Sequence, residues 1–116
     1  MAEYLALIYE DEAAYASATP AVYGEVMAAH QKFGADHEKA LKGGNALQAT
    51  TTATSIRRDS SGNVTVTDGA FAETKEALGG YYLIEASDLD EALEIAKQVP
   101  ARFGGVELRP IMTFDD

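Results

Sequence analysis

The chain lacks cysteine entirely and has no long apolar run. Without cysteine it can form no disulfide, thiolate nucleophile or thiolate metal site. The apolar run at the start, residues 4–9, is far shorter than the roughly 20 residues of a membrane-spanning helix. No basic segment precedes it, as one would in a signal peptide. We therefore expect a cytoplasmic protein that does not span a membrane.

Positive charge is also scarce. Nine Lys and Arg residues stand against nineteen Asp and Glu residues, which gives a formal net charge of -10. Binding to nucleic acid requires clustered cations that face phosphates, so nucleic acid is excluded as a partner. The same negative field disfavours anionic membrane surfaces, and it disfavours anionic ligands except where Lys or Arg side chains gather.

Neither a Pro/Gly/Ser-rich linker nor a shift in composition divides the 116 residues. A chain of this length forms one domain that buries about two-thirds of its unfolded surface, so we expect a single domain over residues 1–116. No glycine-rich phosphate loop and no serine nucleophile elbow is present. We expect no bound cofactor.

The first half of the chain predicts a strand, a helix and a second strand. Residues 3–9 are continuously apolar and rich in β-formers, as in a buried strand. Thr19 and Pro20 supply a helix cap and first residue. The apolar residues that follow at helical spacing are Val22, Val26, Ala29, Phe33 and Ala40. Residues 43–45, Gly-Gly-Asn, are expected to end that helix, and the threonine-rich residues 47–58 favour a strand.

The second half predicts a hairpin, a strand, a helix and a last strand. Turn residues at 59–63 should fold residues 64–67 back antiparallel. Residues 80–86 form another strand with apolar residues on both faces. Ser87 or Asp88 caps a second helix, whose buried stripe is expected to be Leu89, Leu93 and Ala96. The last strand covers 106–113, and Pro110 indicates an edge position or a bulge.

This order, β-α-β-β-β-α-β, predicts an α+β fold: a ferredoxin-like split βαβ plan with an extra hairpin strand in a five-stranded layer. Two helices cover only one face of such a sheet. The strands at 4–9 and 81–84 nevertheless carry large apolar residues on both faces. An apolar uncovered face indicates an interface, so we expect a homodimer joined sheet to sheet.

Residues 68–76 read Asp-Gly-Ala-Phe-Ala-Glu-Thr-Lys-Glu, and residues 78–82 read Leu-Gly-Gly-Tyr-Tyr. With these motifs the chain resembles the DGPF group of the YCII-related family, whose signature differs only in having proline where Ala70 stands. The likeness extends over nearly the whole chain. Without the fixed φ of proline, the loop has more conformational freedom, which we expect to change its free energy by up to about 1 kcal/mol.

The resemblance implies a dimeric α+β barrel with a cleft beside the first helix, and a largely unknown function. The wider family includes a dehydrochlorinase for which a His–Asp general acid/base pair has been proposed. Its histidine matches His30, whereas its aspartate falls near Val99 and Pro100 and is absent here. Asp68 from the signature loop could rebuild the pair.

His30 and Asp68 are thus the candidate catalytic residues, since a histidine beside a cleft can shuttle a proton near neutral pH. A purely structural hydrogen bond for His30 and a turn role for Asp68 remain open. Candidate ligand-binding residues are Phe71, Lys75, Arg109 and Tyr82: an aromatic contact, two of the few cations and a cleft tyrosine.

No metal site is predicted. His37 lies about 10 Å along the helix from His30, too far for both to bind one ion. Two functions stay open: a cofactor-independent enzyme or binder of a small aromatic or carbonyl ligand, and a non-catalytic regulatory module. The second follows from relatives that resemble proteins linked to extracytoplasmic-function sigma factors, so a sigma-factor partner is possible.

Overall fold

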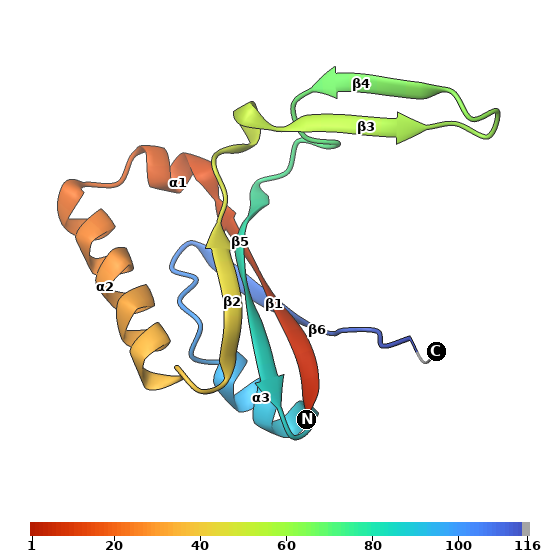
Figure 1. The fold of residues 1–116 in the computed structure, drawn as a ribbon. Helices are drawn as coiled ribbons and strands as arrows, with labels where there is room; N and C mark the ends of the chain where they lie inside the picture. The colour runs from red at the N-terminus through yellow and green to blue at the C-terminus, as the bar shows by residue number, and fades with distance from the viewer. Residues whose placement is uncertain (115–116) are drawn as a thin grey trace.

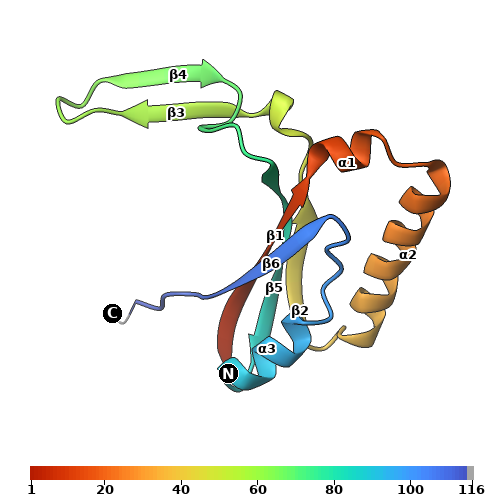
Figure 2. The same cartoon turned by 180° about the vertical axis from the view of Figure 1, so that it is seen from behind.

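The computed structural model describes residues 1–114, which build a four-stranded antiparallel sheet with two longer helices on one face (Figures 1 and 2). The strand order is β2-β5-β1-β6. The strands are β1 (Ala2–Asp11), β2 (Leu41–Ala46), β5 (Glu76–Ala86) and β6 (Gly104–Pro110). The helices are α1 (Glu12–Ala16), α2 (Pro20–Asp36) and α3 (Leu89–Ala96). This connectivity confirms the ferredoxin-like α+β plan.

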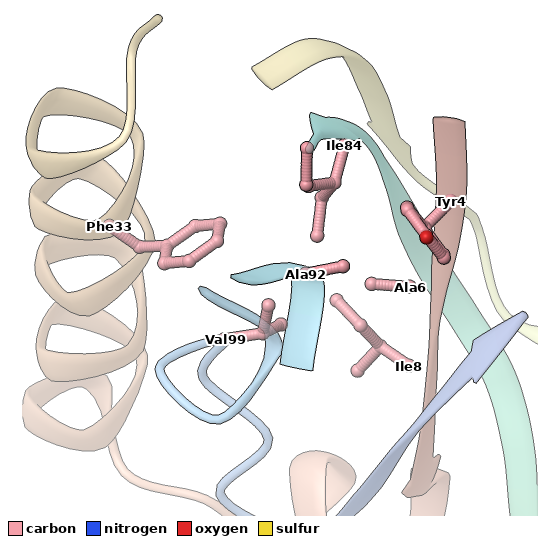
Figure 3. Packing of buried hydrophobic residues seen from close by; sticks show 8 residues of the cluster. Tyr4, Ala6, Ile8, Phe33, Ile84, Ala92 and Val99 are labelled. Carbon is pink, nitrogen blue, oxygen red and sulfur yellow. The ribbon is translucent and has the colours of Figure 1, made fainter. Parts of the chain in front are cut away.

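β1 lies inside the sheet and is paired on both sides, with β5 and with β6. Because side chains alternate along a strand, its even-numbered residues Tyr4, Ala6 and Ile8 face the helices and are buried. They pack with Ile84 of β5 and with helix-side residues that include Phe33, Ala92 and Val99 (Figure 3). The core therefore occupies only the helix-facing side.

α2 begins as the sequence predicts, since the Thr19 hydroxyl accepts a hydrogen bond from the Val22 N–H at 3.3 Å. Its predicted end is wrong: α2 stops at Asp36, and a turn leads into β2 at Leu41. Residues 43–45 lie in that strand. Glycine is required there because a Cβ on Gly44 would come within 2.9 Å of the Tyr82 ring.

α3 is capped by Asp88, which accepts from the Glu91 N–H at 2.9 Å, while the Glu91 carboxylate accepts from the Ser87 N–H at 3.0 Å. This reciprocal pair is the predicted capping box. The predicted stripe is only partly right. Ala92 and Ala96 are buried, whereas Leu89 and Leu93 are 52% and 42% exposed. The small alanine side chains, not the leucines, pack against the sheet.

The segment between β2 and β5 corrects the predicted five-stranded layer. Residues 47–58 are not one strand: a 3-10 turn, η1 (Thr50–Thr52), precedes β3 (Thr54–Arg58). β3 pairs only with β4 (Val64–Asp68), in a separate two-stranded sheet that projects from the body as an arm (Figure 1). The turn joining them is as expected, because the Asp59 carboxylate accepts from the Ser61 and Asn63 N–H groups at 2.9 Å each.

We predict that alanine is far more destabilising at one of two neighbouring glycines of β6 than at the other. A Cβ on Gly104 would lie 1.9 Å from the Tyr9 carbonyl oxygen, whereas a Cβ on Gly105 would meet nothing within 4 Å. Gly104→Ala should therefore lower the free energy of unfolding by about 2–3 kcal/mol. Gly105→Ala should change it by no more than about 0.5 kcal/mol. Urea unfolding measures both, and equal values would contradict the close approach.

Candidate functional site

A cavity of about 660 Å³ lies on the helix-facing side of the sheet, between α2, α1 and the strands β1, β2 and β5. Its volume falls in the range of pockets that bind small molecules, about 300–1,000 Å³. Most of its lining is apolar. The polar side chains that line it include Glu10, Glu12, Tyr15, Tyr23, His30 and Tyr82.

Small residues on β2 and β5 make room for this cavity. Gly44, Ala46 and Gly80 line it, and Ala46 stands opposite Gly80 in the strand pairing. In α2 only Phe33, near the C-terminal end of the helix, is fully buried. Val22 and Val26, nearer its start, are half-buried. The expected apolar stripe of α2 thus meets the core at one end and the cavity at the other. The double glycines at 43–44 and 79–80 belong to the strands β2 and β5 beside the cavity.

His30 and Tyr82 form the only hydrogen bond that joins α2 to β5 among the side chains of residues 1–114. The His30 Nδ1 lies 2.8 Å from the Tyr82 hydroxyl oxygen, and the two rings stack with centroids 5.9 Å apart. The Phe33 ring packs edge-on against Tyr82, with centroids 4.9 Å apart. One aromatic contact and one hydrogen bond with Tyr82 therefore hold the imidazole beside the cavity, and Phe33 supports Tyr82 in turn.

Burial lowers the pKa of His30 below its ordinary 6.5, because desolvation disfavours the imidazolium; the negative charge of Glu10 opposes this effect. Burial likewise raises the pKa of the Tyr82 hydroxyl. At neutral pH the pair is therefore an uncharged imidazole beside an uncharged phenol. An uncharged imidazole can accept a proton, which is what a general base requires.

Glu10 is the site residue that the sequence analysis missed. Its carboxylate is only 8% exposed, and both its oxygens accept from the Tyr15 hydroxyl at 2.9 Å. The Phe103 N–H adds a bond of 3.1 Å. Desolvation, followed by the hydrogen bond to Glu10, raises the pKa of Tyr15 to about 12. The sequence could have predicted this burial. Side chains alternate along a strand, so residue 10 faces the same side as residues 4, 6 and 8, which point into the core.

The other acids of that segment also have structural partners. Asp11 caps α1, a short helix that the sequence analysis did not foresee, by accepting from the Ala13 N–H at 2.9 Å. Glu12 accepts from both the N–H and the hydroxyl of Thr50, at 2.9 and 2.5 Å. Glu12 thereby ties the base of the arm to the end of β1.

The remaining predicted site residues lie away from the cavity lining. Asp68 is exposed at the end of β4, opposite Thr54. Phe71 is 61% exposed, with the Arg57 guanidinium 4.4 Å from its ring centroid. Lys75 is exposed just before β5, and the Arg109 guanidinium lies 3.8 Å from the Glu107 carboxylate on β6.

The structure thus brings His30 and Tyr82 together, and the imidazole bonds to Tyr82 where Asp68 was expected. Roles for Asp68, Phe71, Lys75 and Arg109 stay predictions. Within residues 1–114, no group of three or more His, Asp or Glu side chains is placed to hold a metal ion. Over the same residues, no helix is long and apolar enough to cross a membrane.

A family model described as the YCII-related domain matches residues 2–115, almost the whole chain. The chain belongs to the YCII-related family. The DGPF-type signature and the ferredoxin-like order of its core strands agree with this assignment.

An uncharacterized protein of Rhizobium meliloti (strain 1021) is 45% identical to the chain over 67 residues. That segment covers 55% of this chain and 54% of the relative, so the likeness spans about half the length of each protein. Neither comparison names a substrate.

We predict that the His30 imidazole of the folded protein titrates below pH 6.5, because burial disfavours its charged form. The unfolded chain then binds the proton more readily. The resulting contribution to stability is present above about pH 6.5 and is lost as the pH falls through the folded-state pKa.

NMR titration of the imidazole ring signals measures this pKa. The chain has two histidines, so His37→Gln assigns the His30 signal by elimination. A folded-state pKa at or above 6.5 would contradict the burial of His30.

Proposed function

We propose that this YCII-related domain binds a small, largely apolar molecule in the cavity and that His30 exchanges a proton with it. The observation that supports this proposal is the 2.8 Å bond between the His30 Nδ1 and the Tyr82 hydroxyl at the cavity wall. A largely apolar pocket with a few convergent polar groups and a histidine of perturbed pKa is typical of a small-molecule site.

The second imidazole nitrogen is available for the ligand. Among residues 1–114, no hydrogen bond engages the His30 Nε2, and no side-chain nitrogen or oxygen is both buried and without a partner. Nε2 is therefore accessible from outside the protein. Tyr82 fixes the ring through Nδ1, and Nε2 can accept a proton from a bound molecule.

Tyr82 acts in this proposal as a positioning residue. Its hydroxyl oxygen accepts from the Nδ1–H of His30, which is present both in the uncharged tautomer with a free Nε2 lone pair and in the imidazolium, so the bond is kept before and after proton transfer. The ring of Phe33 supports Tyr82 from the core side. The site can thus move one proton without rearranging its aromatic residues.

We predict that benzyl alcohol, an uncharged probe that does not titrate near neutral pH, binds in the cavity and lowers the pKa of His30 further. A ligand in the cavity excludes water from the imidazolium and so disfavours it. NMR titration follows both the affinity and the imidazole signal. Binding should weaken as the pH falls through the pKa of His30.

Three variants control this experiment. Ala46→Phe places a ring in the cavity and should abolish binding, whereas Ala28→Phe, on an exposed position of α2 outside the cavity lining, should leave binding unchanged. His30→Gln should retain binding but remove its pH dependence. A compound whose turnover is unchanged in His30→Gln would contradict the proton-transfer role, and a probe that binds Ala46→Phe normally would contradict the location.

A second part of the proposal is that the domain works as a homodimer. The sheet face away from the helices is uncovered and carries half-buried apolar residues of β1 and β5: Leu5, Leu7, Tyr9, Tyr81 and Leu83. Tyr81 also accepts a 2.8 Å bond from Asn45 on this face. Large apolar patches on single chains are typical of interfaces.

The shape of the chain supports this part. Its radius of gyration is 16.4 Å, against about 13 Å for a compact domain of this length. Its accessible surface is 8199 Å², against about 6,100 Å² for a compact monomer of its mass. The excess of about 2,000 Å² exceeds the roughly 800 Å² that each partner buries in a standard interface.

The arm formed by β3 and β4 projects on the same side of the sheet as the uncovered face (Figures 1 and 2). Ile56, Val64 and Val66 share one face of this arm and are 60%, 48% and 64% exposed. An isolated two-stranded hairpin is marginally stable in water. A second copy packed on the sheet would also cover the apolar side of the arm.

We predict that Leu7→Lys weakens dimerisation at least about 100-fold, because dimer formation would bury an unpaired charge. The monomer should tolerate the change, since Glu107 stands opposite on β6. Ala28→Lys, on the helix side, should leave dimerisation unchanged. Sedimentation measures the dissociation constant, and circular dichroism checks the fold.

A wild-type chain that stays monomeric at high micromolar concentration would contradict this part of the proposal. If the arm instead engages a sigma-factor partner, as the second function in the sequence analysis has it, co-purification should survive His30→Gln. It should be lost in Val66→Lys, on the apolar face of the arm.

A further inference from the structure

The cavity contains a buried carboxylate that has no cationic partner. Glu10 is 8% exposed and receives two donors, the Tyr15 hydroxyl and the Phe103 N–H. A carboxylate offers about four acceptor positions, so acceptor capacity is left over. Among residues 1–114, neither Glu10 nor Glu12 takes part in an ion pair.

Burying a carboxylate without a positive partner is costly. Hydrogen bonds from a phenol and a backbone amide relieve part of that cost, and a positive charge brought close to Glu10 would relieve more. The cavity is open to ligands and Glu10 lines it. The missing positive charge can therefore come from a bound molecule.

The cavity lining contains no Lys or Arg side chain. The guanidinium in its neighbourhood belongs to Arg102, which lines a smaller adjoining cavity and bonds to Glu25 at 2.5 Å. An anionic ligand in the main cavity would face two carboxylates without a compensating cation. The cavity thus disfavours an anionic ligand such as a carboxylate or a phenolate.

The aromatic lining fits a cation as well. Tyr15, Tyr23 and Tyr82 line the cavity, and the Tyr15 and Tyr23 rings lie with centroids 6.1 Å apart. Aromatic rings attract ammonium groups through their quadrupoles, and clusters of such rings are used to bind ammonium ligands. Because His30 is uncharged at neutral pH, it does not repel a cation.

We infer that the ligand of this cavity is a small protonated amine with an apolar body, whose ammonium group lies by the Glu10 carboxylate among the tyrosine rings. The inference rests on the proposed function, since it names the class of molecule that the same cavity takes. Glu10 then binds the charged end of the ligand, and the apolar lining binds its body.

Three probes of nearly equal size test the inference: benzylamine, benzyl alcohol and benzoate, which are cationic, neutral and anionic at pH 7.5. Each is titrated into the purified protein while the NMR signals of His30, Tyr82 and Ala46 are followed. Benzylamine should bind at least about tenfold more tightly than benzyl alcohol, and benzoate should bind most weakly.

A matched pair of variants separates the local carboxylate from the net charge of -10. Glu10→Gln and Glu94→Gln each remove one negative charge, but Glu94 is an exposed α3 residue outside the cavity lining. Glu10→Gln should bring the ratio of benzylamine to benzyl alcohol affinity close to one. Glu94→Gln should keep the wild-type ratio. If Glu10→Gln does not fold, the ranking of the three probes on the wild-type protein still decides the question.

The outcomes are distinct. Cavity binding of benzyl alcohol or benzoate that equals or exceeds that of benzylamine would overturn the amine inference and leave the proposed small-molecule site intact. A benzylamine preference that Glu10→Gln and Glu94→Gln reduce equally would also overturn it, because net charge would then explain it. If none of the three probes shifts the cavity signals, the proposed function falls together with the inference.

Discussion

The structure depends on the alternation of side chains along β1, one of the two central strands of the sheet. Tyr4, Ala6 and Ile8 face the helices and form the centre of the core. The same alternation carries Glu10 into the protein interior at the end of that row. The alternation along β1 therefore builds the core and delivers a carboxylate to the cavity, although its pairing with β5 shifts by one residue between Ile8 and Tyr9. The register can hardly slip, since a shift by one residue would turn the core residues to the other face.

The cavity exists because two sides of it are built from residues of different size. β2 and β5 carry Gly44, Ala46 and Gly80 where the cavity opens, and α2 reaches the core through the large ring of Phe33. A domain this small gives up apolar burial to hold such a hollow, and burial is its main source of stability. That cost is consistent with a binding role, for which an open, preformed pocket is needed.

The uncovered sheet face and the arm both follow from the small number of elements in the domain. Two helices cover one face of a four-stranded sheet, so the opposite face keeps its apolar residues in contact with water. The insertion between β2 and β5 adds a hairpin on that side without extending the sheet. The cavity and the uncovered face lie on opposite sides of β1 and β5. The two halves of the proposal can thus be tested by separate substitutions.

The sequence by itself determined the family, the order of the core elements and the cap at Thr19, because capping, turn and strand signals are local. It also offered Ser87 or Asp88 as the second cap and named His30 and Tyr82 as candidate site residues. Only the tertiary structure decided that residues 43–45 form a strand, that β3 and β4 leave the sheet, and that Glu10 and Tyr15 meet beside His30. These outcomes depend on contacts between segments far apart in the chain. Glycine shows the difference: locally it indicates a helix end, but beside the Tyr82 ring it is needed because no Cβ fits.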